Sequence, residues 1–268
     1  MQRVLFCASV SALLRLEYLL ATAVLNALKP DWSQSKKRTF SVRVVSFTHA
    51  TLSSIGCLYS LLSDPNYFKD SYVYKTDSAQ YVFLFTMGYF IYDLIDMFIH
   101  GEAGYSKEYI IHHSLVIVVF SIILITGKLF GFAMIGLLVE VQTIFLHLRT
   151  MVRLAGHSKR GTPAYDFLIN ANMICLFLFR HIPATYLLYA MLFKDVNTPF
   201  VLRSVLIGGL GFLTYHNVHL TMSMMKTDGF FGYEMQYLDE DDVDPLGSVK
   251  SRTNSRSASL AHEAGGNE

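Results

Sequence analysis

The chain has 268 residues, of which 52% are hydrophobic and 16% charged, whereas soluble domains carry roughly 25% charged residues. This composition excludes an ordinary soluble domain and indicates a membrane protein. The formal net charge of +1 provides no global attraction to nucleic acid, so no nucleic-acid partner is expected. The three cysteines lie separately in apolar runs, which argues against a disulfide framework or a zinc ribbon.

Residues 4–28 form the first apolar run, although they include Arg15 and Glu17. This run fits a first spanning helix, and a cleaved signal peptide is the alternative. Its apolar content is longer than the core of a signal peptide, which favours the span. We therefore assign residues 1–39 to an N-terminal span followed by a basic linker.

Six further apolar runs follow, and each approaches the roughly 20 residues needed to cross a bilayer. The sequence therefore predicts an all-α, polytopic transmembrane helical bundle with six or seven spans. The membrane domain is assigned to residues 40–227, and Pro183 is expected to kink the sixth predicted span of the chain. The predicted spans cover residues 42–62, 78–100, 109–126, 130–148, 167–192 and 200–225.

Residues 228–268 are assigned to a tail. It contains an acidic stretch at 239–242 and a segment rich in Ser and Arg at 250–259. Such a composition cannot bury a core and predicts disorder. Lys and Arg concentrate in linker 29–43 and loop 149–160, so the positive-inside rule places the tail in the cytosol and the N-terminus outside.

Acidic and imidazole groups occur inside the third and fourth predicted spans, where they are costly and mark functional sites. Asp93 and Asp96 lie on the third span, and His112 and His113 lie at the start of the fourth. Solvation at the membrane surface is the alternative for the more peripheral groups His100, Glu102 and Glu108. A three-or-four-residue spacing predicts one shared helical face for Tyr89, Tyr92, Asp93, Asp96 and His100.

Further polar groups occupy the remaining spans. Glu140, Thr143 and His147 share a face of the fifth helix. Arg180 lies deep in the sixth and is predicted to pair with Glu140 or Asp93, because an isolated charge there would be costly. His49 on the second span is expected to face the bundle interior.

Three interpretations of these groups compete: a buried structural network, a lipid or acyl-transfer site with a histidine general base, and a metal site. Membrane di-iron enzymes need several short histidine clusters, and here only His112-His113 and His216-x-x-His219 occur, so no metal is expected. No nucleotide-binding or nucleophile motif is present, so no cofactor is expected either. The periodicity does not choose between the first two interpretations.

The acyl-transfer interpretation predicts one cavity with four candidate catalytic residues: His112, His113, Asp93 and Asp96. Apolar side chains such as Phe90, Ile111 and Val116 would hold an acyl tail there. Membrane lipids and their fatty-acyl chains are the expected partners, and no protein partner is indicated. The candidates for lipid binding are Tyr89, Tyr92, Glu140, His49 and Arg180.

Several stretches, taken together and in order, resemble the TLC-domain family, which includes the translocating-chain-associating membrane protein, the ceramide synthases and a ceroid-lipofuscinosis protein. The resemblance covers about residues 40–225. The matching stretches are 45–49 (VSFTH), 88–96 (GYFIYDLID), 108–113 (EYIIHH), 137–141 (LLVEV), 144–149 (IFLHLR) and 177–180 (FLFR).

The resemblance implies a role in setting the fatty-acyl composition of membrane phospholipids. It is strongest to a branch that limits long polyunsaturated chains and thereby regulates membrane fluidity, with the plasma membrane as the expected location and the endoplasmic reticulum as the alternative. In the ceramide synthase branch, the position matching His112-His113 is catalytic. This chain lacks the extended ceramide synthase motif and carries Glu140 on the fifth span, so the resemblance leaves acyl transfer from acyl-CoA to another acceptor as the alternative.

Overall fold

The structure is a computed structural model that describes residues 1–101, 107–159, 161–194 and 198–234. These described residues are 83% helical and contain no strand, which confirms the all-α prediction. Six helices are long and apolar enough to cross a membrane, as predicted. These six are Gln2–Leu28, Gln34–Ser63, Asp77–Ile99, Lys107–Thr126, Phe130–Leu154 and Pro163–Phe193.

The fifth and sixth of these helices are each divided into shorter elements. A turn at Leu138 separates α6 from α7, and a π-helical turn separates α8 from α9. The seventh predicted span forms α10, a helix of 28 residues that is not among the six. The elements are α1 Gln2–Leu28, α2 Gln34–Ser63, α3 Asn66–Lys69, α4 Asp77–Ile99, α5 Lys107–Thr126, α6 Phe130–Leu137, α7 Val139–Leu154, α8 Pro163–Leu176, η2 Phe177–His181, α9 Ile182–Phe193 and α10 Phe200–Thr227.

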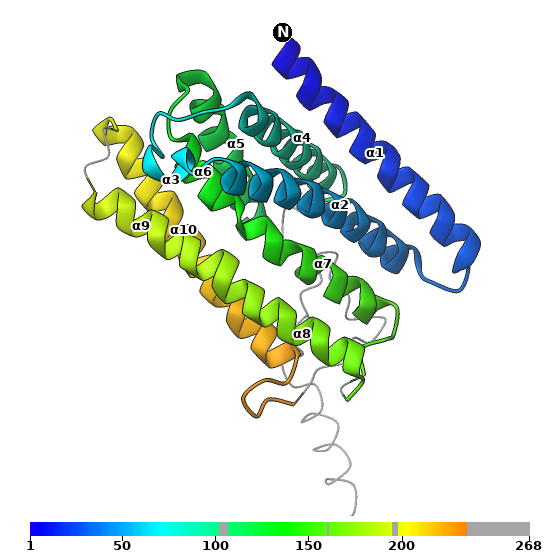
Figure 1. The fold of residues 1–268 in the computed structure, drawn as a ribbon. Helices are drawn as coiled ribbons and strands as arrows, with labels where there is room; N and C mark the ends of the chain where they lie inside the picture. Colours follow the sequence, from blue (N-terminus) through cyan, green and yellow to red (C-terminus); the bar gives the residue numbers. More distant parts are fainter. Residues whose placement is uncertain (102–106, 160, 195–197, 235–268) are drawn as a thin grey trace, which may run out of the picture.

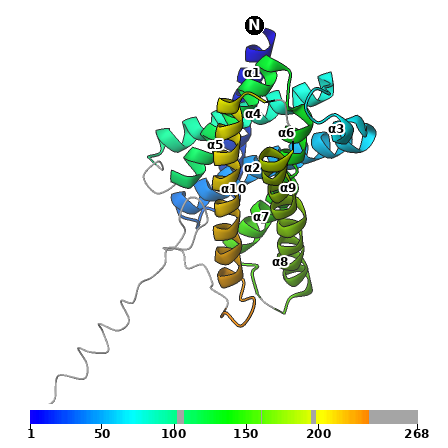
Figure 2. The same ribbon diagram turned by 90° about the vertical axis from the view of Figure 1, so that its left-hand side faces the viewer.

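Helix α2 is central to the bundle, since it packs against α1, α4 and α7 (Figure 1). Its buried face carries small polar residues, which allow the close helix approach typical of membrane bundles. Two of these, Ser53 and Ser54, lie in the middle of that face. On the far side of α7, the continuous rod formed by α8, η2 and α9 runs beside α10 (Figures 1 and 2).

Helix α1 packs on α4 at a glycine. A Cβ atom added at Gly88 would lie 2.8 Å from the Val10 Cβ, so a larger residue would force the two helices apart. The Ser11 hydroxyl donates to the Gly88 carbonyl at 2.7 Å. The first predicted span is therefore a packed member of the bundle in this structure.

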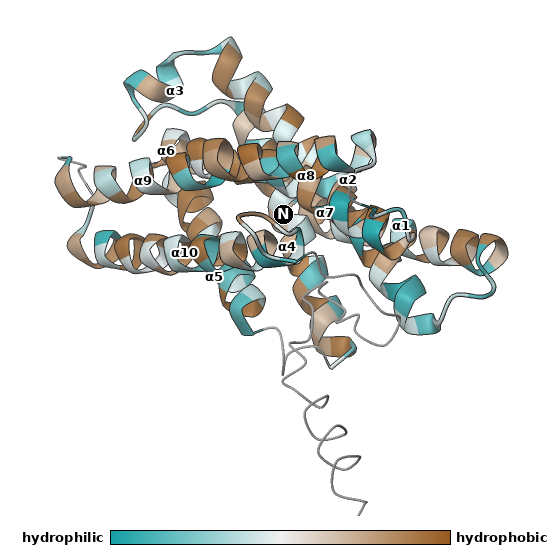
Figure 3. Ribbon diagram, turned by 90° about the horizontal axis from the view of Figure 1, so that it is seen from below, coloured by the Kyte–Doolittle hydropathy of each residue, from teal (hydrophilic) through white to brown (hydrophobic). Residues whose placement is uncertain are grey.

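The outward faces of the helices carry large apolar side chains. Leu20 on α1, Ile125 on α5 and Phe200 on α10 are all exposed, and brown hydrophobic residues mark the outer turns of the helices in Figure 3. Soluble monomers rarely expose so much contiguous apolar surface. Together with the six long apolar helices, this surface indicates a multi-pass membrane protein.

The π-helical turn Phe177–His181 is separated from Pro183 by Ile182 alone. Proline lacks a backbone N–H and its ring clashes with the carbonyl of the preceding turn, which accounts for a change of hydrogen-bond register next to the proline where the sequence predicts a kink. This turn carries Arg180, and it sets the direction in which that side chain leaves the helix.

The end of α10 differs from its sequence assignment. The sequence assigns residue 228 to the start of a tail, whereas the Asp228 carboxylate is fully buried against α7 and α8. The described chain continues past α10 through a turn at Gly229 to Glu234. The predicted disorder of the acidic and Ser-rich segments concerns residues that lie outside the described part of the chain.

Candidate functional site

Two adjoining cavities lie inside the bundle. The larger, here called the polar chamber, has a volume of about 480 Å³ and is lined by the first half of α2, the first turns of α5, most of α7, and the last turns of α4 and α10. Its charged and histidine lining residues come from these segments and from η2. They are Arg43, Asp93, Lys107, Glu108, His112, His113, Glu140, His147, Arg149, Arg180, His216 and His219.

The second, here called the apolar cavity, has a volume of about 160 Å³. It extends from the polar chamber between α5, α6, α9 and the first half of α10, and its walls are almost entirely hydrophobic. The two cavities share five lining residues, which define the junction between them. These are Phe90, His112, Val139, Glu140 and Arg180.

The histidine pair reaches the chamber as predicted. His113 is buried, and its Nδ1 lies 3.0 Å from the Asp93 Oδ2, although the contact falls outside hydrogen-bond geometry. His112 lies at the junction, and its buried Nδ1 finds no hydrogen-bond partner among the described residues. The carboxylate beside His113 restrains that ring, whereas His112 keeps a nitrogen available to a ligand.

Asp96 does not belong to this site, which corrects the prediction of one cavity lined by both acids. It contacts Arg15 Nη1 at 3.1 Å and Arg38 Nη2 at 2.8 Å, and it lines neither cavity. Three residues along an α-helix place two side chains about 60° apart around the axis. That angle directs Asp93 toward α5, whereas Asp96 faces α1 and α2 and joins them by ion pairs.

Two other predicted residues also lie away from the cavities. Tyr92 is buried but lines neither cavity, and Ile111 is half exposed and lines neither. The other two residues predicted to hold an acyl tail, Phe90 and Val116, do line the apolar cavity. Ile111 precedes the histidine pair on α5, and its side chain points outward from the bundle.

Tyr89, His49 and Glu140 form one group, in which His49 contacts both of the other residues. The His49 ring stacks on Tyr89 with ring centroids 3.8 Å apart, and its Nδ1 lies 3.9 Å from the Glu140 Oε2. The Tyr89 hydroxyl donates to the Ser46 hydroxyl at 2.9 Å. Tyr89 and Glu140 line the chamber, whereas His49 lies behind them and supports both.

Arg180 does not form the predicted ion pair. Its guanidinium donates to Gln142 Oε1 at 3.0 Å, Thr143 Oγ1 at 3.1 Å and Asn217 Oδ1 at 3.3 Å. No carboxylate lies within 4.0 Å of it among the described residues. The prediction was wrong because neutral oxygen atoms from α7 and α10 satisfy the buried donors, while Glu140 acts on the charge from across the junction.

A polar contact between α5 and α10 is not among the sequence predictions. Glu108 Oε2 lies 3.0 Å from His216 Nδ1 and 3.8 Å from His219 Nδ1, at the edge of the polar chamber. The two histidines are three residues apart on α10, so both rings face the same acid. The described residues contain no group of three or more potential ligands that could hold a metal ion.

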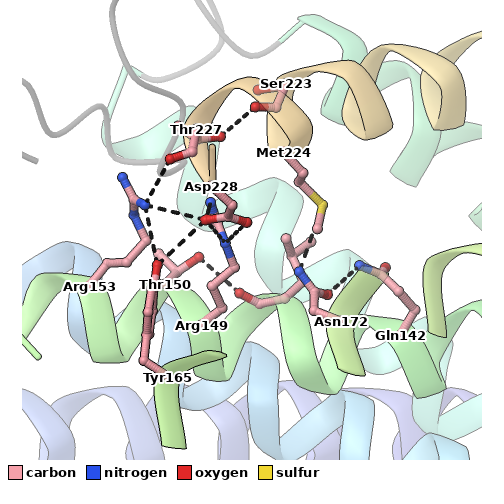
Figure 4. Close-up of polar contacts among 11 residues, drawn as sticks. Gln142, Arg149, Thr150, Arg153, Tyr165, Asn172, Ser223, Met224, Thr227 and Asp228 are labelled. Carbon is pink, nitrogen blue, oxygen red and sulfur yellow. Dashed lines mark hydrogen bonds and ion pairs between the residues drawn. The ribbon is translucent and has the colours of Figure 1, made fainter. Parts of the chain in front are cut away.

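A second missed cluster closes the chamber at the end of α10. The buried Asp228 carboxylate accepts hydrogen bonds from Arg149 Nε at 2.7 Å and Arg149 Nη2 at 2.6 Å, as Figure 4 shows. Arg153 and Tyr165 approach the same carboxylate, so residues of α7 and α8 hold the last turn of α10. The only sequence signal for this cluster is an acidic residue, Asp228, directly after an apolar helix. Because the segment that follows it is polar, the sequence groups Asp228 with the tail.

These features define a class of protein: a multi-pass helical membrane protein with an apolar cavity that opens into a histidine- and arginine-lined chamber. The TLC-domain family model matches residues 39–226, which is more than half of the chain, and the chain belongs to this family.

Relatives with similar sequences are TLC domain-containing proteins. The chain is 34% identical over 145 residues to TLC domain-containing protein 1 of Gallus gallus, covering 54% of this chain and 56% of that protein. It is 30% identical over 185 residues to TLC domain-containing protein 2 of Danio rerio, covering 68% and 74%. The match to the Gallus gallus protein thus spans little more than half of its length. These relatives agree with the branch that the sequence motifs resemble.

Proposed function

We propose that this protein regulates the fatty-acyl composition of membrane phospholipids and thereby membrane fluidity, limiting the content of polyunsaturated chains, and that it acts at the plasma membrane. The proposal is supported by membership of the TLC-domain family and by similarity to TLC domain-containing proteins 1 and 2. It also draws on the shape and lining of the two cavities.

The observation that carries the proposal is the junction between the cavities. An amphiphilic lipid needs an apolar enclosure for its chain and a polar one for its head group, and this bundle places the two end to end. The group that joins chain to head would then lie beside His112, Glu140 and Arg180. A purely structural polar network would have no need of such an enclosure.

A second candidate function is acyl-CoA-dependent transfer of an acyl chain to a lipid acceptor. It is favoured by the position of His112 at the junction and of the Asp93–His113 contact beside it. A histidine general base would take the proton of the acceptor hydroxyl as its oxygen attacks the thioester carbonyl. The carbon–sulfur bond would break, and the thiol of coenzyme A would leave with a proton.

The regulatory proposal is tested by phospholipid analysis of cells that lack the protein and are supplied with polyunsaturated fatty acids. Restoring the wild-type chain should lower the polyunsaturated content of the phospholipids, and the double variant His112→Ala, His113→Ala, at matched abundance, should not. Equal lipid profiles for cells with and without the wild-type chain would refute the proposal. Purified protein assayed with acyl-CoA and lysophospholipid decides the second candidate, because only an acyltransferase releases free coenzyme A.

A further inference from the structure

The polar chamber is unusually rich in nitrogen donors that the protein itself does not use. Arg180 carries five N–H groups, and three hydrogen bonds, all to neutral oxygen atoms, account for its contacts among the described residues. His112 and His147 are both buried or nearly so, and the Nδ1 of each lacks a hydrogen-bond partner within the described chain. All three side chains line the chamber.

The chamber's carboxylates do not occupy these donors. Asp93 contacts His113 at 3.0 Å, Glu108 contacts His216 at 3.0 Å, and the nearest base to Glu140 is His49 at 3.9 Å. Arg149 is neutralised by Asp228, which lies outside the chamber lining. The positive charge of Arg180 therefore faces the junction without a contacting acid.

Buried donors without partners are costly, and an anion with several acceptor oxygens would satisfy them together. We propose that the polar chamber binds the phosphate group of a phospholipid or lysophospholipid, with Arg180, His147 and His112 donating to its oxygen atoms. All three side chains line this one chamber, so they can address one anion. The acyl chain of the same molecule occupies the apolar cavity, which the chamber meets at Arg180 and His112.

This assignment rests on the proposed function and adds to it the chemical group by which the lipid is held. A lipid source of the phosphate is favoured over a free ion because the donors lie at the mouth of an apolar cavity. An isolated phosphate would gain nothing from that cavity, whereas a lysophospholipid buries its chain there.

The test uses the full chain purified in a maltoside detergent, which contains no phosphate. Binding of lysophosphatidylcholine is compared with binding of a monoacylglycerol that has the same acyl chain. The phosphate-bearing ligand should bind at least about tenfold more tightly, the gain expected from one charge-assisted hydrogen bond. Arg180→Gln and His147→Gln should each remove most of this difference.

Two matched variants serve as controls. Arg203 also donates to neutral carbonyls, but at the start of α10 and outside both cavities. His157 is exposed beyond the end of α7. Arg203→Gln and His157→Gln should bind both ligands as the wild type does. If Arg180→Gln fails to fold, His147→Gln carries the same comparison.

Equal affinity for the two ligands, or loss of both ligands in every chamber variant, would overturn the phosphate assignment. Inorganic phosphate or coenzyme A that binds as tightly as the lysophospholipid would overturn the lipid source, whereas displacement only at much higher concentration supports it. The cellular lipid analysis separates this result from the proposed function. A wild-type protein that shows no preference for the phosphate-bearing ligand but still lowers the polyunsaturated content of cellular phospholipids would reject the phosphate site alone.

Discussion

Asp228 and Arg149 form a doubly bonded ion pair between the end of α10 and the last turns of α7, with Arg149 Nε 2.7 Å from Oδ2 and Nη2 2.6 Å from Oδ1. The Asp228 carboxylate is completely buried. This pair fixes the helix that forms one wall of both cavities, because α10 otherwise meets α7 and α8 through few apolar residues.

Asp228→Asn should destabilise the folded protein by about 3–5 kcal/mol, the cost of removing one partner from a buried pair. The buried Arg149 would keep its charge without a counter-ion. Thermal unfolding in detergent, monitored as the loss of the monodisperse species, measures the change in stability. Asp31→Asn, at an exposed position before α2, is the matched control and should melt as the wild type does. Equal melting of the two variants would contradict the role assigned to the pair.

Asp93 and Asp96 should have separable effects, although they are three residues apart on α4. Asp93→Asn removes the carboxylate beside His113 and should abolish the effect on phospholipid acyl composition. Asp96→Asn weakens the contacts with Arg15 and Arg38 and should lower thermal stability. The protein that remains folded should keep the wild-type effect on phospholipid acyl composition. Lipid analysis at matched abundance checks both. Loss of the lipid effect in both variants would instead support the prediction that Asp93 and Asp96 belong to one functional site.

Filling the apolar cavity should change which acyl chains the protein affects. Ala184 on α9 lines this cavity, so Ala184→Phe would occupy part of its volume of about 160 Å³. The variant should lose its effect on the longest polyunsaturated chains before the shorter ones, as measured by phospholipid chain profiles. Ala23→Phe adds the same ring to the exposed face of α1 and should leave the profile unchanged. An unchanged profile for a folded Ala184→Phe protein would argue against chain binding there.

The tail should be reached from the cytosol. The basic residues of linker 29–43 and of loop 149–160 predict this orientation through the positive-inside rule. A cysteine introduced by Ser255→Cys in a chain whose native cysteines are replaced should react with an impermeant reagent only after the plasma membrane is opened. A cysteine at Gln2, introduced by Gln2→Cys, should react in intact cells. The reverse pattern would invert the assigned topology.

The helical class, the positions of the helices and part of the site follow from the amino-acid sequence alone. Long apolar runs have few alternatives to a membrane helix, because a backbone in lipid must satisfy its own hydrogen bonds. Local spacing also placed Glu140, Thr143 and His147 on one face, and all three line the polar chamber. The Asp93–His113 contact joins neighbouring spans, which a short loop makes adjacent.

The partner of each buried charged side chain depends instead on how the helices pack together. Asp96 and Asp93 share a helix and a broad face, but the packing of α1 and α2 on one side and α5 on the other gives them different partners. Arg180 takes neutral acceptors on α7 and α10, and Asp228 joins the core through Arg149. Helical periodicity gives the direction in which a side chain leaves its own helix axis. Its partner depends on how the axes of helices distant in sequence are arranged, and the local spacing of residues does not specify that arrangement.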